Sequence, residues 1–213
     1  MLPLCVTICA NGSAMGGWYN DAPRSAKDEK QSANLARLLD KLIAELTQSI
    51  EGNGRCYDTV LLCELHELAM RDVIDTAGKV RDREVEIRGS RHQPPNAADV
   101  AALLDQMFVD LEGIASAVES AAFVMWRINW IHPFDDGNGR IARSFAMLVL
   151  FARLRRLPLS YADKPNFFDL LARYRLDYFD ALEAADRAWA MGAVDVRVMS
   201  SLLFRVVQQS LDV

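Results

Sequence analysis

The sequence predicts an all-α fold of about seven helices with one short β-hairpin, and three observations support this. Apolar residues recur three and four positions apart through most of the 213 residues, which is the spacing of amphipathic helices. Alternation of apolar and polar residues, the pattern of a strand, is confined to residues 83–88. No stretch of linker-like composition divides the chain, so a single domain is expected.

The first two predicted helices occupy residues 28–50 and 59–74, where leucine, isoleucine and valine form one apolar face. Gly52 and Gly54 follow the first helix and end it. The turn-forming residues 75–78 end the second.

The predicted strand pattern follows that turn. Val85 and Ile87 lie on one side of residues 83–88 and charged residues lie on the other, which indicates one leg of a hairpin. Pro94 and Pro95 close this segment.

The remaining helices fill the rest of the chain and are separated by glycine and proline. Pro133 ends the helix that precedes the most polar turn, and the helix after that turn is strongly apolar, as expected of a central core element. Their predicted ranges are 96–111, 114–130, 138–155, 166–189 and 194–211.

The composition is that of a globular protein and limits the possible functions. Hydrophobic residues make up 51% of the chain and charged residues 25%, which excludes a disordered or fibrous protein. The 24 basic and 29 acidic residues give a net charge of −5, which argues against an extended nucleic-acid groove. No apolar run reaches the roughly 18 residues of a membrane span. We therefore expect a cytoplasmic protein that binds neither nucleic acid nor membrane.

The cysteines and two of the histidines do not form a metal site by their spacing. Cys5, Cys9, Cys56 and Cys63 lack paired metal-ligand spacing and are expected to be free thiols. His66 and His92 lack partners for a metal site.

Residues 131–143 carry the features of a polyphosphate site. Gly137 and Gly139 lie where the helix 138–155 begins, so unpaired backbone N–H groups and the positive end of the helix dipole meet there. Arg140 and Arg143 are three residues apart and thus nearly on one face, where two guanidinium groups can bind successive phosphates.

Three other side chains of this segment complete a chemical hypothesis. His132 has an ordinary pKa near neutrality and can take a proton from an attacking hydroxyl. Asp136 can hold Mg²⁺, which commonly takes one or two carboxylates together with phosphate oxygens. Phe134 is interpreted as an apolar anchor of the loop. The implied reaction is attack of a hydroxyl on a nucleotide phosphate.

The segment resembles the signature of Fic-domain proteins, H-x-F-x-[DE]-G-N-G-R-x-x-R, at every fixed position from His132 to Arg143. The resemblance implies the Fic fold and a nucleotidyltransferase that moves AMP from ATP to a Ser, Thr or Tyr hydroxyl of a target protein or of the chain itself. It implies His132 as general base and Asp136 as Mg²⁺ ligand. It also implies a phosphate site made of Gly137, Asn138, Gly139, Arg140 and Arg143, with Arg143 at the γ-phosphate.

The resemblance also assigns parts of the chain. Residues 28–213 would form one Fic domain with a catalytic loop at 132–140, whereas residues 1–27 match nothing we can name. A flap at about 80–93 would pair with the extended backbone of the target through Arg83, Val85 and Ile87.

A second motif resembles the inhibitory helix of autoinhibited Fic proteins, [ST]-x-x-x-E-[GN], in the class that carries this helix N-terminal to the catalytic motif. Thr47, Glu51 and Gly52 match it, which would place the inhibitory helix at about 28–52. Glu51 would then form an ion pair with Arg143 and hold ATP in an unproductive pose.

Two alternatives stay open at this stage. One is an enzyme that removes AMP or uses another nucleotide. The other is a regulatory module that senses nucleotide without catalysis, against which the intact His132 argues.

Overall fold

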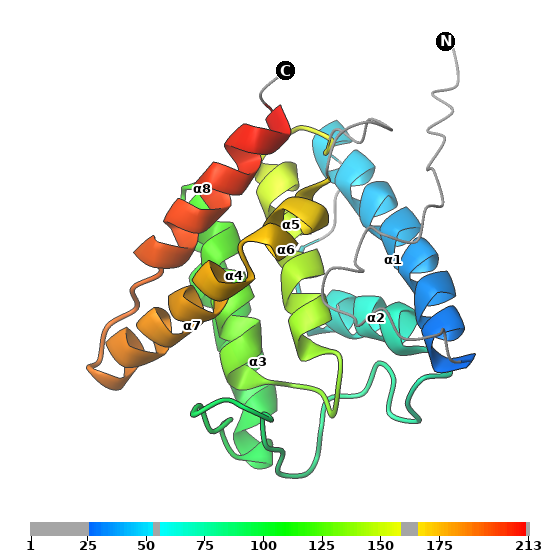
Figure 1. Ribbon diagram of the computed structural model, residues 1–213, viewed down its shortest axis with the longest axis vertical. Helices are drawn as coiled ribbons and strands as arrows, with labels where there is room; N and C mark the ends of the chain where they lie inside the picture. The colour runs from blue at the N-terminus through cyan, green and yellow to red at the C-terminus, as the bar shows by residue number, and fades with distance from the viewer. Residues whose placement is uncertain (1–25, 53–55, 159–165, 212–213) are drawn as a thin grey trace.

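The computed structural model describes residues 26–52, 56–158 and 166–211, and its regular structure is helical throughout (Figure 1). The eight α-helices confirm the all-α prediction but exceed the expected seven by one. They are α1 (Ala26–Glu51), α2 (Thr59–Met70), α3 (Val100–Glu112), α4 (Ala117–Ile131), α5 (Asn138–Leu154), α6 (Phe167–Arg173), α7 (Arg175–Ala190) and α8 (Arg197–Leu211), with a 3-10 turn at Ala97–Asp99 before α3.

The additional helix arises because the predicted helix 166–189 breaks at Tyr174. This residue leaves the helical conformation, with φ −100° and ψ 31°, although no glycine or proline is nearby. Its ring lies 5.0 Å from the guanidinium of Arg205, and its hydroxyl accepts a hydrogen bond from Gln209 Nε2 (2.7 Å). Both partners belong to α8, so tertiary contacts accompany a break that the local sequence does not indicate.

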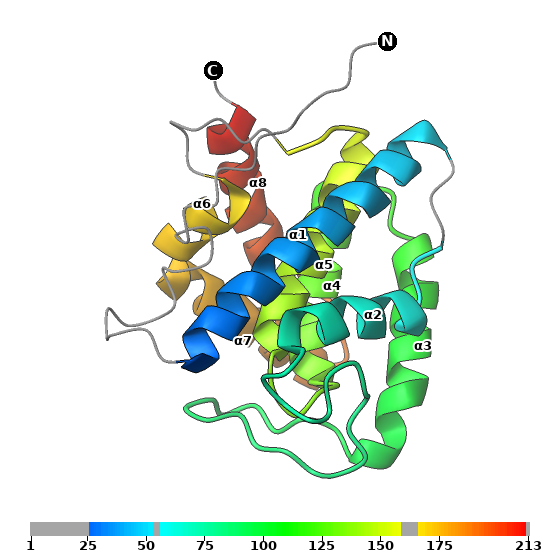
Figure 2. The ribbon, with the colours of Figure 1, turned by 90° about the vertical axis from the view of Figure 1, so that its right-hand side faces the viewer.

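Helices α4 and α5 pair at the centre of the molecule, and the other helices surround them (Figure 1). Helix α4 is buried on most of its circumference and packs against α3, α5, α7 and α8. Helix α1 crosses α5 and also packs on α2 (Figure 2). The predicted apolar face of α1 is confirmed by Leu38, Leu42 and Leu46, which are fully buried.

The predicted β-hairpin at residues 80–93 is wrong, because no strand occurs among the described residues. Val85 and Ile87 are partly buried and their charged neighbours are exposed, so the alternation itself is real. The buried guanidinium of Arg81 connects the two sides of this segment in place of backbone hydrogen bonds between strands. Its Nη1 donates to the carbonyl oxygen of Arg83 (3.0 Å) and its Nη2 donates to that of Pro95 (2.6 Å). Pro94 and Pro95, on the second side of the segment, have no N–H to donate to a partner strand.

Several predictions concern residues outside the described ranges. Residues 1–25, which include Cys5 and Cys9, are among these. Cys56 and Cys63 are free thiols, as predicted.

In the described part of the chain, no helix combines the length and the apolar character needed to cross a bilayer.

Candidate active site

The loop that joins α4 to α5 has one conformation imposed by its own side chains. His132 ends α4 in the left-handed conformation (φ 52°), and Gly137 precedes α5 in the same region (φ 82°). Between them, the buried Asn138 amide closes the turn: its Oδ1 accepts from Phe134 N–H (2.9 Å) and its Nδ2 donates to Phe134 O (2.7 Å). The side chain of Asn138 therefore shapes the loop, and only its backbone is left for a phosphate.

Phe134 anchors the loop in the core, as the sequence predicts, and is fully buried. Its ring stacks on that of His66, with centroids 3.7 Å apart and ring planes 5° apart. The N–H of Gly78 donates to His66 Nδ1 (2.8 Å), so the proton of the neutral ring is on Nε2, which donates to Asp136 O (2.9 Å). Burial is the main reason that the pKa of His66 is lowered, which favours this neutral form.

His66 is thus a positioning residue that sequence reasoning missed. The isolated place of His66 on the apolar face of α2 gives no local sign of a partner about 70 positions later in the chain.

The chemical state of His132 suits a base. Its Nδ1 lies 3.2 Å from the carbonyl oxygen of Asn129, which can only accept, so Nδ1 carries the proton. Nε2 then keeps its lone pair. Burial lowers the pKa of His132 to about 4, and the nearby charge of Arg81 acts in the same direction. At neutral pH the imidazole is therefore uncharged and able to accept a proton.

Arg81 is a second residue that sequence reasoning missed. It is 4% exposed, and its Nε donates to His132 O (2.8 Å) while its backbone N–H donates to Pro133 O (2.8 Å). Together with its bonds to Arg83 O and Pro95 O, these contacts connect the flap segment to the loop between α4 and α5. A lone arginine before the strand-like pattern gave no sequence signal of this role.

Arg83 also contacts the loop. Its Nη2 and Nε lie 2.7 and 3.1 Å from the two carboxylate oxygens of Asp135, and Thr76 Oγ1 donates to Asp135 Oδ2 (2.8 Å). Asp135 is therefore engaged, while the neighbouring Asp136 has an exposed carboxylate whose Oδ1 accepts from Gly137 N–H (2.7 Å). The loop thus presents one exposed carboxylate directly before α5.

The two arginines of α5 lie on different sides of the loop. Arg140 Nη1 donates to Ala69 O (3.2 Å) and contacts Met70 Sδ (3.0 Å), at the end of α2. Arg143 Nη1 lies 3.3 Å from the place where a Cβ on Gly139 would be. The predicted common face is therefore only partly realised: Arg143 lies over the first turn of α5, and Arg140 extends toward α2.

The position of the end of α1 does not support the predicted contact between Glu51 and Arg143. Ile50, which precedes Glu51, has its carbonyl bound by Arg155 Nη2 (2.6 Å) beyond the last residue of α5. Arg143 lies about 18 Å earlier along that helix, at 1.5 Å per residue. Glu51 is exposed, and Thr47 Oγ1 donates within its own helix to Ile43 O (2.8 Å).

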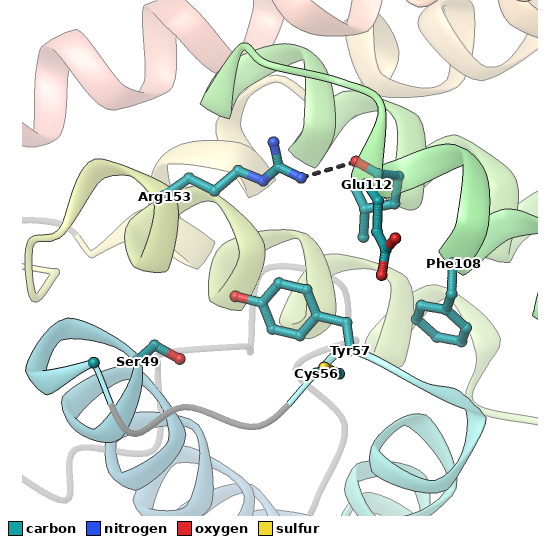
Figure 3. A pocket seen from close by; sticks show the side chains of 8 residues that line it. Ser49, Cys56, Tyr57, Phe108, Glu112 and Arg153 are labelled. Atoms are coloured by element: carbon teal, nitrogen blue, oxygen red, sulfur yellow. Dashed lines mark hydrogen bonds between the residues drawn. The ribbon is translucent and has the colours of Figure 1, made fainter.

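The surroundings of the end of α1 agree with this position. Ser49 and Arg153 line a cavity of about 280 Å³ together with residues from α3 and from the segment just before α2 (Figure 3). Across this cavity, Arg153 Nη2 donates to Leu111 O (2.8 Å). The end of α1 therefore lies beside the C-terminal half of α5, whereas the catalytic loop precedes its other end. The motif at residues 47–52 matches in sequence, but the helix that carries it ends near the C-terminal end of α5.

Comparison with known proteins agrees with this fold and loop. Residues 56–150 match the model of the Fic/DOC family. Protein adenylyltransferase Fic of Nematostella vectensis is 27% identical over 142 residues, which are 64% of this chain and 29% of that protein.

Solved structures show the same fold at low identity. A Fic family protein from Desulfovibrio desulfuricans superposes with a TM-score of 0.68 at 21% identity, covering 94% of this chain and 58% of that one. Fic-1 from C. elegans superposes with a TM-score of 0.67 at 18% identity, covering 94% of this chain and 56% of that one. The chain thus spans less than two thirds of the length of each of these relatives. Over residues 56–150 the chain is similar to the Fic/DOC family, and it is distantly similar to protein adenylyltransferase Fic.

Proposed function

We propose that this protein is an adenylyltransferase that moves AMP from ATP to a hydroxyl of a protein. The observation that supports this best is the state of His132, a neutral imidazole whose Nε2 keeps a lone pair next to the start of α5. The name of the Nematostella vectensis relative supports the same reaction.

The proposed reaction is a single displacement at the α-phosphorus of ATP. The target hydroxyl oxygen forms the new bond to phosphorus while its proton passes to His132 Nε2. The bond from the α-phosphorus to the oxygen shared with the β-phosphate breaks, and pyrophosphate leaves with the electron pair. The products are the AMP ester of the target and pyrophosphate.

The start of α5 would hold the phosphates. The first N–H groups of a helix lack partners within that helix, and the dipole places positive potential there. The backbone N–H groups of Asn138 and Gly139 would supply these donors, and that of Gly137 would join them by leaving Asp136 Oδ1. Arg143 would bind the γ-phosphate, and Arg140 would have to leave its contacts at the end of α2 to bind a phosphate.

Asp136 fits the role of a Mg²⁺ ligand. The described residues contain no group of three or more His, Cys, Asp or Glu side chains that would form an all-protein site. One exposed carboxylate beside a phosphate site is nonetheless what Mg²⁺ commonly uses in nucleotide enzymes. When bound, the ion would offset phosphate charge.

The target would dock along the flap segment. Residues 84–87 form neither a helix nor a strand, so their backbone can pair with an extended peptide. Val85 and Ile87 would set the register by their partial burial. Arg83 would hold this segment at the loop through Asp135, and a target bound there would have its hydroxyl near His132.

The reaction class is tested by incubating the protein with Mg²⁺, a cell lysate and ATP labelled at either the α- or the γ-phosphorus. Label on a protein band, including the chain itself, is expected from α-labelled ATP and not from γ-labelled ATP. Parallel samples with the other three α-labelled nucleotides give the base preference. No labelled band from any α-labelled nucleotide would overturn the proposal, as would transfer of the γ-label alone.

We expect the exchange of Glu51 for glycine to leave the labelling rate within about twofold of that of the wild type, as for an ordinary surface residue. The reason is the position of Glu51 at the far end of α5 from Arg143. The matched control is Glu112→Gly, since Glu112 is also the exposed last residue of a helix, α3, at the same end of the molecule. A tenfold increase specific to Glu51→Gly would show that Glu51 restrains the active site after all.

A further inference from the structure

Arg143 is held by more than its place on α5. Its guanidinium lies where Gly139 leaves space, and the amide oxygen of Asn129 is 3.8 Å from the same hypothetical Cβ. Asn129 belongs to α4, so the predicted γ-phosphate ligand lies against both central helices.

A third helix also reaches this arginine. Tyr178 of α7 is 1% exposed, and its hydroxyl accepts a hydrogen bond from Asn129 Nδ2 (3.0 Å) and interacts with the side chain of Arg143. Because a guanidinium only donates, Tyr178 Oη is the acceptor in both contacts. Burial raises the pKa of Tyr178, so the phenol stays uncharged at neutral pH.

The neighbours of Tyr178 fix its hydroxyl in place. Asn129 Nδ2 also donates to Met125 O (2.7 Å), which sets the orientation of the amide. On the next turns of α7, Asp186 Oδ1 accepts from Trp126 Nε1 (2.8 Å), which binds α7 to α4 independently of Tyr178. The hydroxyl is therefore a fixed acceptor, in a helix that lies beyond the residues matching the family model.

We propose that Tyr178 is a positioning residue that orients the Arg143 guanidinium toward the terminal phosphate of a nucleoside triphosphate. The inference rests on the proposed function insofar as Arg143 binds that phosphate. A long arginine side chain loses conformational freedom when it binds a phosphate. A fixed, neutral acceptor already orders the side chain before the nucleotide binds, so less conformational entropy is lost on binding. A carboxylate in the same place would compete with the phosphate for the guanidinium, whereas a neutral phenol leaves its charge available. Tyr178 thus favours a triphosphate over a diphosphate.

The test is the exchange Tyr178→Phe, which removes the hydroxyl and keeps the ring. ATP and ADP affinities are measured by calorimetry with Mg²⁺ for each variant. We expect Tyr178→Phe to weaken ATP binding about tenfold, the effect of one hydrogen bond to a charged group, and to change ADP binding by less than about twofold. The matched control is Tyr174→Phe, which removes a hydroxyl bound to Gln209 and is expected to change neither affinity.

The ratio of the two affinities separates positioning from a structural role. A loss shared equally by ATP and ADP, or a lowered unfolding temperature with an unchanged ratio, would overturn the inference. If Tyr178→Phe does not fold, Asn129→Ala removes the other partner of the hydroxyl. This variant is expected to lower the ratio of ATP affinity to ADP affinity in the same way. Binding is measured without transfer, so a wild type that binds ATP and labels nothing refutes the proposed function while the ratio still tests Tyr178.

Discussion

Replacing His132 with alanine is expected to lower AMP transfer at least about a hundredfold, the usual contribution of a general base. The neutral ring offers Nε2 as the proton acceptor, and no other group in the catalytic loop combines that position with an available lone pair. ATP affinity should remain within about twofold, because the predicted phosphate ligands lie on α5 rather than on this ring. The measurement is the initial rate of labelling from α-labelled ATP, with ATP binding followed separately.

The control for this exchange is His92→Gln. His92 is also a partly buried histidine near the site, and its Nε2 contacts Trp130 O (2.7 Å). An amide keeps a donor for that carbonyl, so transfer should change by less than about threefold if His132 alone is the base. Labelling by His132→Ala at the wild-type rate would refute the assignment.

The pH profile gives a second measurement of the same residue. Burial lowers the pKa of His132 to about 4, so the ring is already neutral at pH 5.5 and the rate there should match that at pH 7.5. A histidine with its ordinary value near 6.5 would be about 90% protonated at pH 5.5, and the rate would fall about tenfold. The expected profile is therefore flat from pH 8 to about 5, with a loss only as the pH falls through about 4.

The determinants of the loop conformation are local in the sequence. Phe134, Gly137 and Asn138 act within a few residues of one another, through an apolar anchor, a left-handed position and a side-chain bond to the backbone. Such features follow from residue type and spacing. The helix ranges were accessible for the same reason, since periodicity and glycine or proline positions are local.

The errors involve contacts between distant segments. Arg81 bonds to backbone atoms 50 and 51 positions later, and these bonds join the flap segment to the end of α4. The break at Tyr174 accompanies contacts with α8. Glu51 matched a motif whose meaning depends on where the end of α1 lies relative to α5, which the spacing of residues in the chain does not determine.

The exchange Gly137→Ala is expected to destabilise the fold and abolish transfer together. Gly137 has φ 82°, where a Cβ costs about 1–2 kcal/mol. Its Cβ would also lie 2.8 Å from Met70 Sδ, and Met70 is 1% exposed, so packing restricts its movement. The strain of overpacking adds about 1–3 kcal/mol. Relief would move the first turn of α5, and with it the proposed phosphate donors. The free energy of unfolding in urea and the labelling rate measure the two effects.

Gly192→Ala is the matched control for the cost of placing a Cβ in the left-handed backbone conformation. Gly192 has nearly the same conformation, φ 83°, but nothing lies within 4 Å of its Cβ position. This variant should lose only about 1–2 kcal/mol and keep its labelling rate. The difference between the two exchanges then measures the contact with Met70.

A double-mutant cycle with Met70→Ala tests that contact directly. Met70→Ala alone destabilises the core because it leaves a cavity. In that background the cost of Gly137→Ala should fall toward that of Gly192→Ala, since the sulfur at 2.8 Å is gone while His66 Nε2, at 3.3 Å, still approaches the new Cβ. An equal cost of Gly137→Ala in both backgrounds would show that Met70 does not set the requirement for glycine. Because the same sulfur contacts Arg140, the cycle also reports whether the end of α2 holds the phosphate loop in its position for transfer.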